Sequence, residues 1–396
     1  MGLPLDGIRV LELGDFLPSA YACMQLGDFG AEVIRVQPPA RAQGRRSQQA
    51  ASVPQAPRSP FDAERRFDTP NRNRRSIVID LKHAQGQEAA QRLADRCDVL
   101  VEGYRPGVLD RLGMGYEQLA QRNPRLVYCS VSLFGQTGPY RDIPGHDPLA
   151  LGVAGLLHLA SDPPDDVPRL LGSPVGDIGA GLHALSGILL ALRERDRSGK
   201  GQRVDISMTE AALAFSMLSS VQVLQGTTVP RLNKPNAISG IFRTADDRYL
   251  VTTNLEAHHW ANFCKAIGRD DLMALRYDRA RRDELLKTVR EILRTRTRHE
   301  WLSIFTGALE SQAAPVNRIE EVFDDPHIQA REMVIEVKDE QGLAGRQLAP
   351  TIRLGRTPGR IAAVAPPAGA HTRSLMTEAG YSVAEIDALL TAQVLG

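Results

Sequence analysis

Short apolar runs recur along the first third of the chain, and stretches with helical spacing separate them. Runs rich in Val, Ile and Leu are typical of strands that are buried on both faces of a parallel sheet. The intervening segments have the length and spacing of helices. The pattern therefore predicts an α/β fold, a parallel sheet with helices on both faces, with strands IRVLELG (8–14), AEVIRVQ (31–37), SIVIDLK (76–82), DVLVEGY (98–104) and LVYCSVSLFG (126–135).

The pattern becomes helical in the middle of the chain. Residues 177–196 have apolar side chains at helical spacing and charges only at the far end, which predicts one long, largely buried helix. The SGKG turn at 198–201 ends it, and a second helical block follows at 206–224. Residues 38–60, rich in Pro, Gln, Ala, Ser and Arg, have no periodicity and are predicted to be a mobile loop.

A composition shift at 226–237 is the best candidate for a linker. Beyond it, residues 239–256 predict a hairpin that turns at Asp246 and Asp247. Helices around 257–323 complete a smaller α+β unit. The sequence therefore predicts a large unit over 1–225 and a small one over 226–330.

Composition narrows the possible partners. The chain has 396 residues and a net charge of +1, so no overall electric field attracts nucleic acid or an anionic membrane, and we expect neither as a partner. No apolar run looks long enough to span a bilayer. The cysteines lie far apart without a CxxC pair, which predicts no disulfide framework, no metal site and a reducing, cytoplasmic location; they are Cys23, Cys97, Cys129 and Cys264.

Two glycine-rich segments lead into helices. In GQTGPYRDIPGHDP (135–148), Asp147 before a proline fits a helix N-cap, whereas a cap does not require His146. His146 is therefore either a surface residue or a base. In SPVGDIGAGLHALSG (173–187), Asp177 is either another N-cap or a functional acid. Glycines in a first turn destabilise a helix, so we expect them to make room for a ligand.

Basic residues cluster near two strands. Arg72, Arg74, Arg75 and Lys82 flank the strand at 76–82, and Arg105 follows the strand at 98–104. Arginine suits phosphate because its planar guanidinium offers paired donors. A solvated basic face explains the same residues equally well. The clusters lie at opposite ends of their strands, so they need not converge.

Together these segments resemble the family III CoA-transferases (CaiB/BaiF type), most closely the α-methylacyl-CoA racemase branch. The resemblance also rests on NRNRRSIVIDLK, EGYRPGVLDRLGMGYEQL and APPAGAHTRSLMTEAGYSVAEIDAL. It implies an interlocked homodimer, a Rossmann-like large domain to which residues 331–396 return, and an acyl-CoA substrate with no cofactor beyond its CoA moiety. CoA-binding residues would be Arg35, Arg74, Arg75, Asp80, Lys82, Gly103, Tyr104, Arg105 and Asp147.

Two branches of this family share the aspartate that matches Asp177. Transferases use it as a nucleophile on the thioester, whereas in racemases it is one of two bases. The sequence GHD at 145–147 and the segment LEAHHWANFCKAIG match the racemase branch, which implies that His146 is the second base and that Glu256 orients it. Backbone N–H groups in the first turn after Asp177 would stabilise the enolate.

The resemblance therefore predicts an α-carbon racemase of 2-methylacyl-CoA thioesters, with CoA transfer as the alternative. A non-catalytic protein that binds CoA esters is a third hypothesis. The chain departs from the family pattern at Gln37, at Pro148 and Leu149, and in a longer loop over 40–65. These departures leave the acyl group open.

Overall fold

The computed structural model describes residues 2–39, 68–161, 167–228, 236–307 and 311–396. Nearly all of the predicted loop at 38–60 and of the longer insertion at 40–65 lies outside these ranges. The described chain divides into two compact units. Unit 1 contains residues 1–157, 170–225 and 332–396, and unit 2 contains residues 158–169 and 226–331. Sequence reasoning had placed the segment 158–169 in the large unit.

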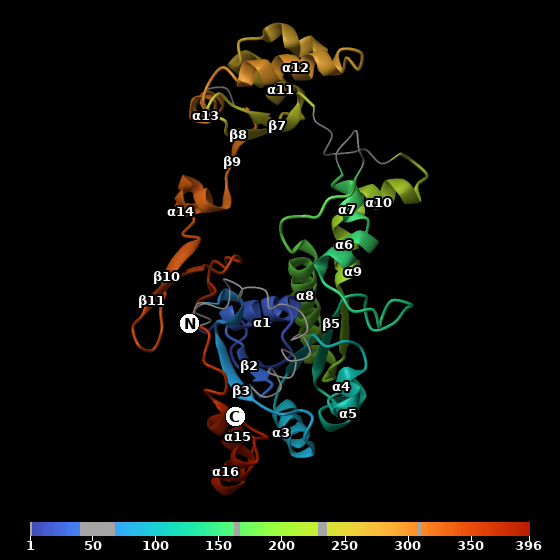
Figure 1. Ribbon diagram of the computed structural model, residues 1–396, viewed down its shortest axis with the longest axis vertical. Coiled ribbons are helices and arrows are strands. Elements are labelled where there is room, and N and C mark those ends of the chain that lie inside the picture. The colour runs from blue at the N-terminus through green and yellow to red at the C-terminus, as the bar shows by residue number, and fades with distance from the viewer. Residues whose placement is uncertain (1, 40–67, 162–166, 229–235, 308–310) are drawn as a thin grey trace, which may run out of the picture. The chain divides into compact units, whose positions relative to one another are not determined.

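Unit 1 is built around a parallel six-stranded sheet (Figure 1). The strand order β3-β2-β1-β4-β5-β6 is that of a doubly wound dinucleotide-binding fold. All five predicted strands are present, and the α/β prediction is confirmed. The strands are β1 (Arg9–Leu13), β2 (Glu32–Gln37), β3 (Arg74–Val78), β4 (Val99–Glu102), β5 (Val127–Ser132) and β6 (Arg203–Ser207).

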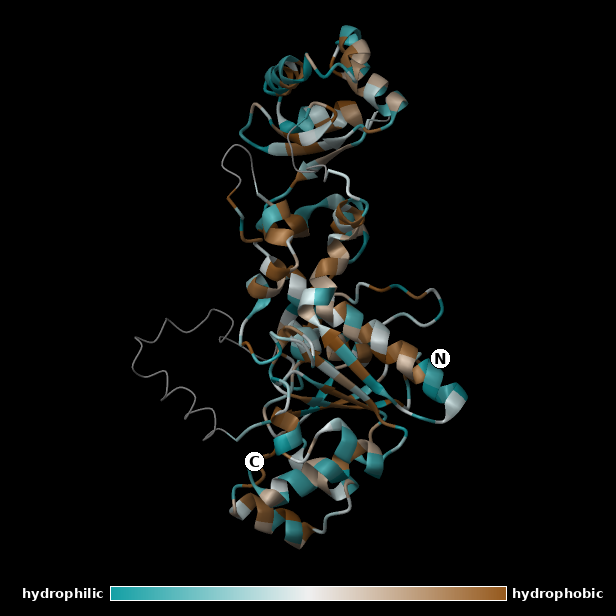
Figure 2. Ribbon diagram, turned by 90° about the vertical axis from the view of Figure 1, so that its right-hand side faces the viewer, coloured by the Kyte–Doolittle hydropathy of each residue, from teal (hydrophilic) through white to brown (hydrophobic). Residues whose placement is uncertain are grey.

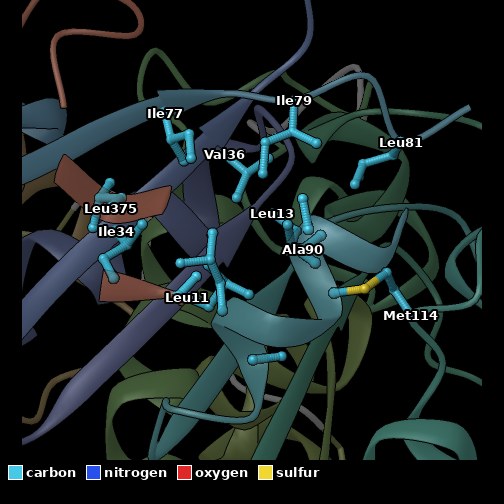
Figure 3. Packing of buried hydrophobic residues seen from close by; sticks show 14 of the residues in the cluster. Leu11, Leu13, Ile34, Val36, Ile77, Ile79, Leu81, Ala90, Met114 and Leu375 are labelled. Carbon is cyan, nitrogen blue, oxygen red and sulfur yellow. The ribbon is translucent and has the colours of Figure 1, made fainter. Parts of the chain in front are cut away.

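The sheet is covered on both faces. Residues that alternate along the strands divide between two apolar cores, such as Leu11 in one and Val10 in the other. Figure 3 shows the first core, in which Leu11, Ile34 and Ile77 of neighbouring strands meet Leu375 from the C-terminal part of the chain. This face carries α3 (Ala84–Ala94), α4 (Val108–Arg111), α5 (Tyr116–Arg122), α15 (Thr372–Glu378) and α16 (Val383–Thr391).

The opposite face carries α1 (Leu17–Asp28), α6 (Asp147–Val153), α8 (Val175–Ser198) and α9 (Met208–Phe215), with α10 (Met217–Leu224) following. The predicted helical block at 206–224 is thus wrong at its start, which is strand β6, and is broken at Ser216. By length and composition α8 could span a bilayer, contrary to the sequence expectation. Half of its apolar window is buried, as in the core helix of a folded unit.

The C-terminal part of the chain returns to the edge strand β3. A short antiparallel hairpin, β10 (Val334–Lys338) and β11 (Ala344–Leu348), comes first. Arg72 binds Asp28 through two nitrogens and also donates to the carbonyl of Leu348. Farther along, Leu395 forms a bridge with Ile79. Both ends of the chain therefore build unit 1.

Unit 2 has a three-stranded antiparallel sheet of β7 (Ser239–Arg243), β8 (Tyr249–Thr253) and β9 (Ala313–Val316). The predicted hairpin is confirmed, and Asp247 takes a left-handed conformation in its turn. Its helices carry hydrophobic and hydrophilic residues on the same ribbon, as amphipathic helices do (Figure 2). They are α11 (Ala257–Ala266), α12 (Arg282–Leu293), α13 (Arg298–Phe305) and α14 (Pro326–Ala330), with short 3₁₀ turns at 270–275 and 319–324.

Candidate active site

Asp147 and Asp177 lie in the first turns of two neighbouring helices of unit 1. α6 begins at Asp147 with His146 in the N-cap position, so the predicted cap is displaced by one residue. α8 begins at Val175, which makes Asp177 its third residue rather than its N-cap. Neither helix has a side-chain hydrogen bond from its N-cap residue. Capping of their own helices therefore does not explain the two acids.

The Asp147 carboxylate holds the start of the neighbouring helix. Its Oδ1 accepts a hydrogen bond of 2.9 Å from the backbone N–H of Asp177. The Asp147 side chain is buried, and Gly176 beside it is buried too. A Cβ at Gly176 would lie 2.8 Å from the same Oδ1. Asp147 thus caps α8 from α6, and Gly176 leaves the space that this contact needs.

The other glycines of α8 serve close packing. A Cβ at Gly179 would lie 2.4 Å from the ring of Phe215, and one at Gly181 would lie 2.8 Å from the carbonyl oxygen of Pro18. The expectation that these glycines make room for a ligand is therefore wrong. Tight contact of α8 with α1 and α9 offsets the loss of helix stability, which is about 1 kcal/mol per glycine relative to alanine.

Asp177 holds its proton up to unusually high pH. Its carboxyl group is half-buried, and burial is the main cause that raises its pKa to about 6. The negative charge of Asp147 raises this pKa further, whereas His146 lowers it. His146 is itself exposed to solvent. An imidazole and two carboxyl groups therefore act on one another across the two helix starts.

The backbone amides at the start of α8 are mostly engaged. The N–H of Asp177 donates to Asp147, and the N–H of Ile178 donates to the carbonyl of Pro174 at 3.0 Å. These two N–H groups already have acceptors within the protein, so stabilisation of an enolate by the other amides of the first turn stays a prediction.

Glu256 lies in unit 2, directly after β8, in the N-cap position of α11. Its side chain is exposed and makes no capping hydrogen bond. Since Glu256 and His146 belong to different units, their pairing stays a prediction.

Arg74 is the most deeply buried of the basic residues expected to bind CoA. Its Nε lies 2.5 Å from Oε2 of Glu12, its Nη2 lies 3.1 Å from Oε1, and both side chains are 1% exposed. Nη2 also donates to the carbonyl of Ala20. This arrangement is neither a solvated basic face nor an open phosphate site. In this structure Arg74 and Glu12 form a buried ion pair that joins β3 to β1.

Arg35 and Arg75 also have acidic partners. Arg75 forms ion pairs with Glu32 and with Glu378, and the second pair links helix α15 to the sheet. Arg35 lies 2.5 Å from Oδ1 of Asp15, whose side chain is 85% exposed. An ion pair with an exposed partner stabilises little, so Arg35 can exchange this carboxylate for another anion at small cost.

The remaining expected CoA-binding residues lie at the carboxyl edge of the sheet. Asp80 and Lys82 follow β3, and the segment 103–105 follows β4. A Cβ at Gly103 would lie 2.5 Å from Cβ of Phe16, so glycine is required for this close approach. Lys82 and Arg105 are exposed. Parallel strands bring these two cations to one edge, whereas Arg74 and Arg75 lie at the other end of β3.

Sequence reasoning missed Glu102, the residue before this segment. Its side chain is buried, and burial is the main cause that raises its pKa to about 7. An acid at the end of the apolar run DVLVE was the available signal. Within the described ranges, no three His, Cys, Asp or Glu side chains gather as a metal site. All four cysteines are described, and they are free and buried.

Comparison with known proteins identifies the family of this site. Residues 5–372 match the model of CoA-transferase family III. The chain belongs to CoA-transferase family III. A family member similar to it is the succinyl-CoA–L-malate CoA-transferase beta subunit of Chloroflexus aurantiacus, 31% identical over 95% of this chain and 94% of that protein. Another is the human alpha-methylacyl-CoA racemase, 32% identical over 97% and 95%.

A solved structure of the family agrees with this assignment. A CAIB/BAIF family protein from Brucella suis superposes with a TM-score of 0.79 at 27% identity, covering 96% of this chain and all of that one. The resemblance to family III is therefore confirmed. The similar family III proteins include several CoA-transferases as well as the racemase, so the family assignment leaves two activities.

Proposed function

We propose that this family III enzyme racemises the α-carbon of 2-methylacyl-CoA thioesters. The observation that supports this proposal is that His146 and Asp177 lie at the starts of α6 and α8, where the charge of His146 lowers the pKa of Asp177. Inversion requires that one group removes the α-proton while another returns a proton to the opposite face. The Asp177 carboxyl group, with a pKa of about 6, can gain and lose a proton near neutral pH. Histidine is the side chain that most often serves as a general acid or base in catalysis.

In the proposed reaction, one of the two groups takes the α-proton and leaves an enolate of the thioester. The other, which starts protonated, then delivers its proton to the same carbon from the far side. Running the two roles in reverse inverts the other epimer. Asp147 contributes because its negative charge keeps the pKa of Asp177 high enough for protonated and ionised forms to coexist.

Glu256 is proposed to accept a hydrogen bond from the imidazole of His146. Such a carboxylate fixes the tautomer of a histidine and stabilises its protonated form. The CoA moiety is proposed to bind near Lys82 and the segment 103–105. Arginine and lysine donors suit its phosphates, and Arg105 and Lys82 are exposed at one sheet edge.

A second copy of the chain is proposed to cover an apolar surface of unit 1. Leu218 and Leu224 of α10 are 70% and 85% exposed, and Leu190 of α8 is 72% exposed. Large apolar side chains that are exposed in one unit are typical of an interface. Analytical ultracentrifugation tests this, because Leu218→Lys should shift the chain from dimer to monomer.

The activity is tested by proton exchange. A single epimer of a 2-methylacyl-CoA is incubated with the enzyme in D₂O without any acceptor acid. We expect deuterium at the α-carbon together with loss of optical purity, measured by mass spectrometry and chiral chromatography. Absence of both under conditions in which the thioester binds would contradict the racemase proposal.

CoA transfer is the second candidate, because relatives such as the Agrobacterium fabrum succinate–glutarate CoA-transferase, 32% identical, carry that activity in their names. In this reaction the Asp177 carboxylate attacks the thioester carbonyl, the carbon–sulfur bond breaks, and CoA leaves as a thiolate. The thiolate then attacks the aspartyl carbonyl, which releases the donor acid and leaves CoA as a thioester on Asp177. The acceptor carboxylate attacks this thioester and expels the CoA thiolate, and the thiolate attacks the acceptor's acyl carbonyl, which forms the new acyl-CoA and frees the Asp177 carboxylate. Activity that appears only when a free carboxylic acid is added supports this candidate.

A further inference from the structure

Glu102 controls how the chain leaves β4. It is 5% exposed and lies in register between Leu13 of β1 and Ser130 of β5. Its Oε2 accepts a hydrogen bond of 2.8 Å from the backbone N–H of Tyr104. The N–H of Gly103 donates to the carbonyl of Leu13 at 3.2 Å. A backbone hydrogen bond to β1 therefore fixes Gly103, and the Glu102 carboxylate fixes Tyr104.

The same carboxylate lines a small polar pocket with Ser130, Gln136 and Arg203. Ser130 lies opposite Glu102 on β5, and Gln136 Nε2 is buried and has no hydrogen-bond partner among the described residues. The pocket is also lined by Arg105, the exposed cation at the end of the held segment. Glu102, buried polar atoms and Arg105 thus form one connected polar site at the carboxyl edge of the sheet.

The neighbours of Glu102 shift its pKa in opposite directions. Burial raises its pKa to about 7, whereas the Tyr104 N–H, a hydrogen bond with the Ser130 side chain and the charge of Arg203 lower this pKa, and Asp110 of α4 raises it. Arg203 donates to the Gln136 side chain at 2.9 Å, and among the described residues no lysine or arginine pairs with Glu102. The pocket is also lined by Asp110, Tyr116 and Tyr128, and burial raises the pKa of the Tyr128 phenol. Glu102 therefore changes charge near neutral pH.

We propose that Glu102 is a positioning residue whose ionised carboxylate holds the segment 103–105 in the conformation that receives the CoA moiety, and whose protonation releases it. The proposal rests on the proposed binding of CoA at this segment. A hydrogen bond from an N–H to a carboxylate is about twice as strong as one to a neutral acceptor. Protonation of Glu102 therefore weakens the clamp on Tyr104, so acid should loosen the segment and weaken binding.

The test is calorimetric titration with CoA between pH 5.5 and 8.5. For the wild type we expect affinity to fall by about fivefold to tenfold toward the acidic end, as loss of one charge-assisted hydrogen bond predicts. Glu102→Gln keeps an oxygen acceptor but cannot ionise, so this part of the pH dependence should vanish. The 3′-phosphate of CoA itself titrates near pH 6, so the readout is the difference between wild type and variant. Glu117→Gln, at an exposed position of α5, is the matched control and should behave as wild type.

A second measurement needs no variant. Binding of 3′-dephospho-CoA, which lacks the titrating phosphate, should release about half a proton at pH 6.5, seen by titration in buffers of different ionisation enthalpy. In an enzyme assay, the part of the pH dependence that Glu102→Gln removes should appear in KM, and wild type and variant should share the same pH profile of kcat. Identical pH profiles for wild type and Glu102→Gln, or tighter binding at acidic pH, overturn the proposal while CoA binding stands. Failure to bind CoA at any pH overturns the proposed function and this inference together.

Discussion

The Asp147 carboxylate accepts the backbone N–H of Asp177 at 2.9 Å, so the first residue of α6 caps the neighbouring helix α8. This one contact fixes the backbone of Asp177 and places a negative charge beside its carboxyl group. The first effect is geometric and the second raises the pKa of Asp177. The position of the proposed proton carrier and its acidity therefore depend on the same neighbour.

Replacement Asp147→Asn separates these two effects. The asparagine oxygen can still accept the Asp177 N–H, but the negative charge is lost, so the pKa of Asp177 should fall from about 6. In the pH profile of α-deuterium exchange, the step assigned to Asp177 should move to lower pH. Asp142→Asn, at an exposed position of the same loop, is the control and should leave the profile in place. An unchanged profile in Asp147→Asn would show that the charge of Asp147 does not act on Asp177.

Gly176→Ala tests the space that this contact needs. The added methyl would lie 2.8 Å from Oδ1 of Asp147, so Asp147 must withdraw from the Asp177 N–H. Overpacking typically costs about 1–3 kcal/mol, and the helix preference of alanine offsets about 1 kcal/mol of this. We therefore expect a small loss of stability in urea unfolding and a larger loss of exchange rate. Gly172→Ala, where an added methyl meets nothing within 4 Å, should change neither.

His146→Ala tests the proposed second proton carrier. Because each proton-transfer group typically contributes about 10²- to 10⁴-fold, the rate of racemisation should fall by that factor. The affinity for CoA should stay near the wild-type value, since His146 is exposed and is not among the residues proposed to bind the CoA moiety. A variant that racemises at the wild-type rate would remove His146 from the mechanism.

The buried pair of Arg74 and Glu12 allows a test of whether Arg74 binds CoA or serves only to stabilise the fold. Removing one partner of a buried ion pair typically costs about 3–5 kcal/mol, whereas replacing both partners by apolar residues is often close to neutral. We therefore expect Arg74→Met to lower the free energy of unfolding strongly and Glu12→Met together with Arg74→Met to restore most of it. If Arg74 is structural, the double variant should also bind CoA, which calorimetry can measure. Loss of CoA binding in a stable double variant would support the role that the family resemblance implied.

The structure shows which features of the fold can be predicted from the pattern of hydrophobic and polar residues in the sequence. The five predicted strands are apolar on both faces, so hydrophobicity alone marks them. Strand β6 was missed because its sequence RVDIS is partly exposed and polar, and it reads as the start of the helix that follows. The starts of α6 and α8 were found within a few residues, since proline and acids mark helix beginnings.

What the sequence could not supply are contacts between distant segments. Glycine is required at position 179 because the ring of Phe215 packs against it, and Arg74 pairs with Glu12 on another strand. From the sequence alone the first was expected to make room for a ligand, and the second was expected to lie either at a phosphate or on a solvated basic face. Both explanations were plausible locally, and both needed the packing of separate elements to be tested.

Glu102 also predicts how stability depends on pH. Its pKa of about 7 in the folded protein exceeds the ordinary value of 4.5, so the folded state binds this proton more tightly than the unfolded chain. Below pH 4.5 both states are protonated and no stability is lost. As pH rises toward 7 the unfolded chain ionises first, and stability falls by up to about 3 kcal/mol.

Glu102→Gln does not ionise, so it should escape this loss. We expect the free energy of unfolding of this variant, measured in urea at several pH values, to increase relative to that of the wild type between pH 4.5 and 7. Above pH 7 the difference between the two should stay constant. Glu117→Gln is exposed and should follow the wild-type curve throughout. Wild-type and Glu102→Gln curves that run parallel over this range would mean that Glu102 ionises alike in folded and unfolded chains, and its burial would then not set its charge.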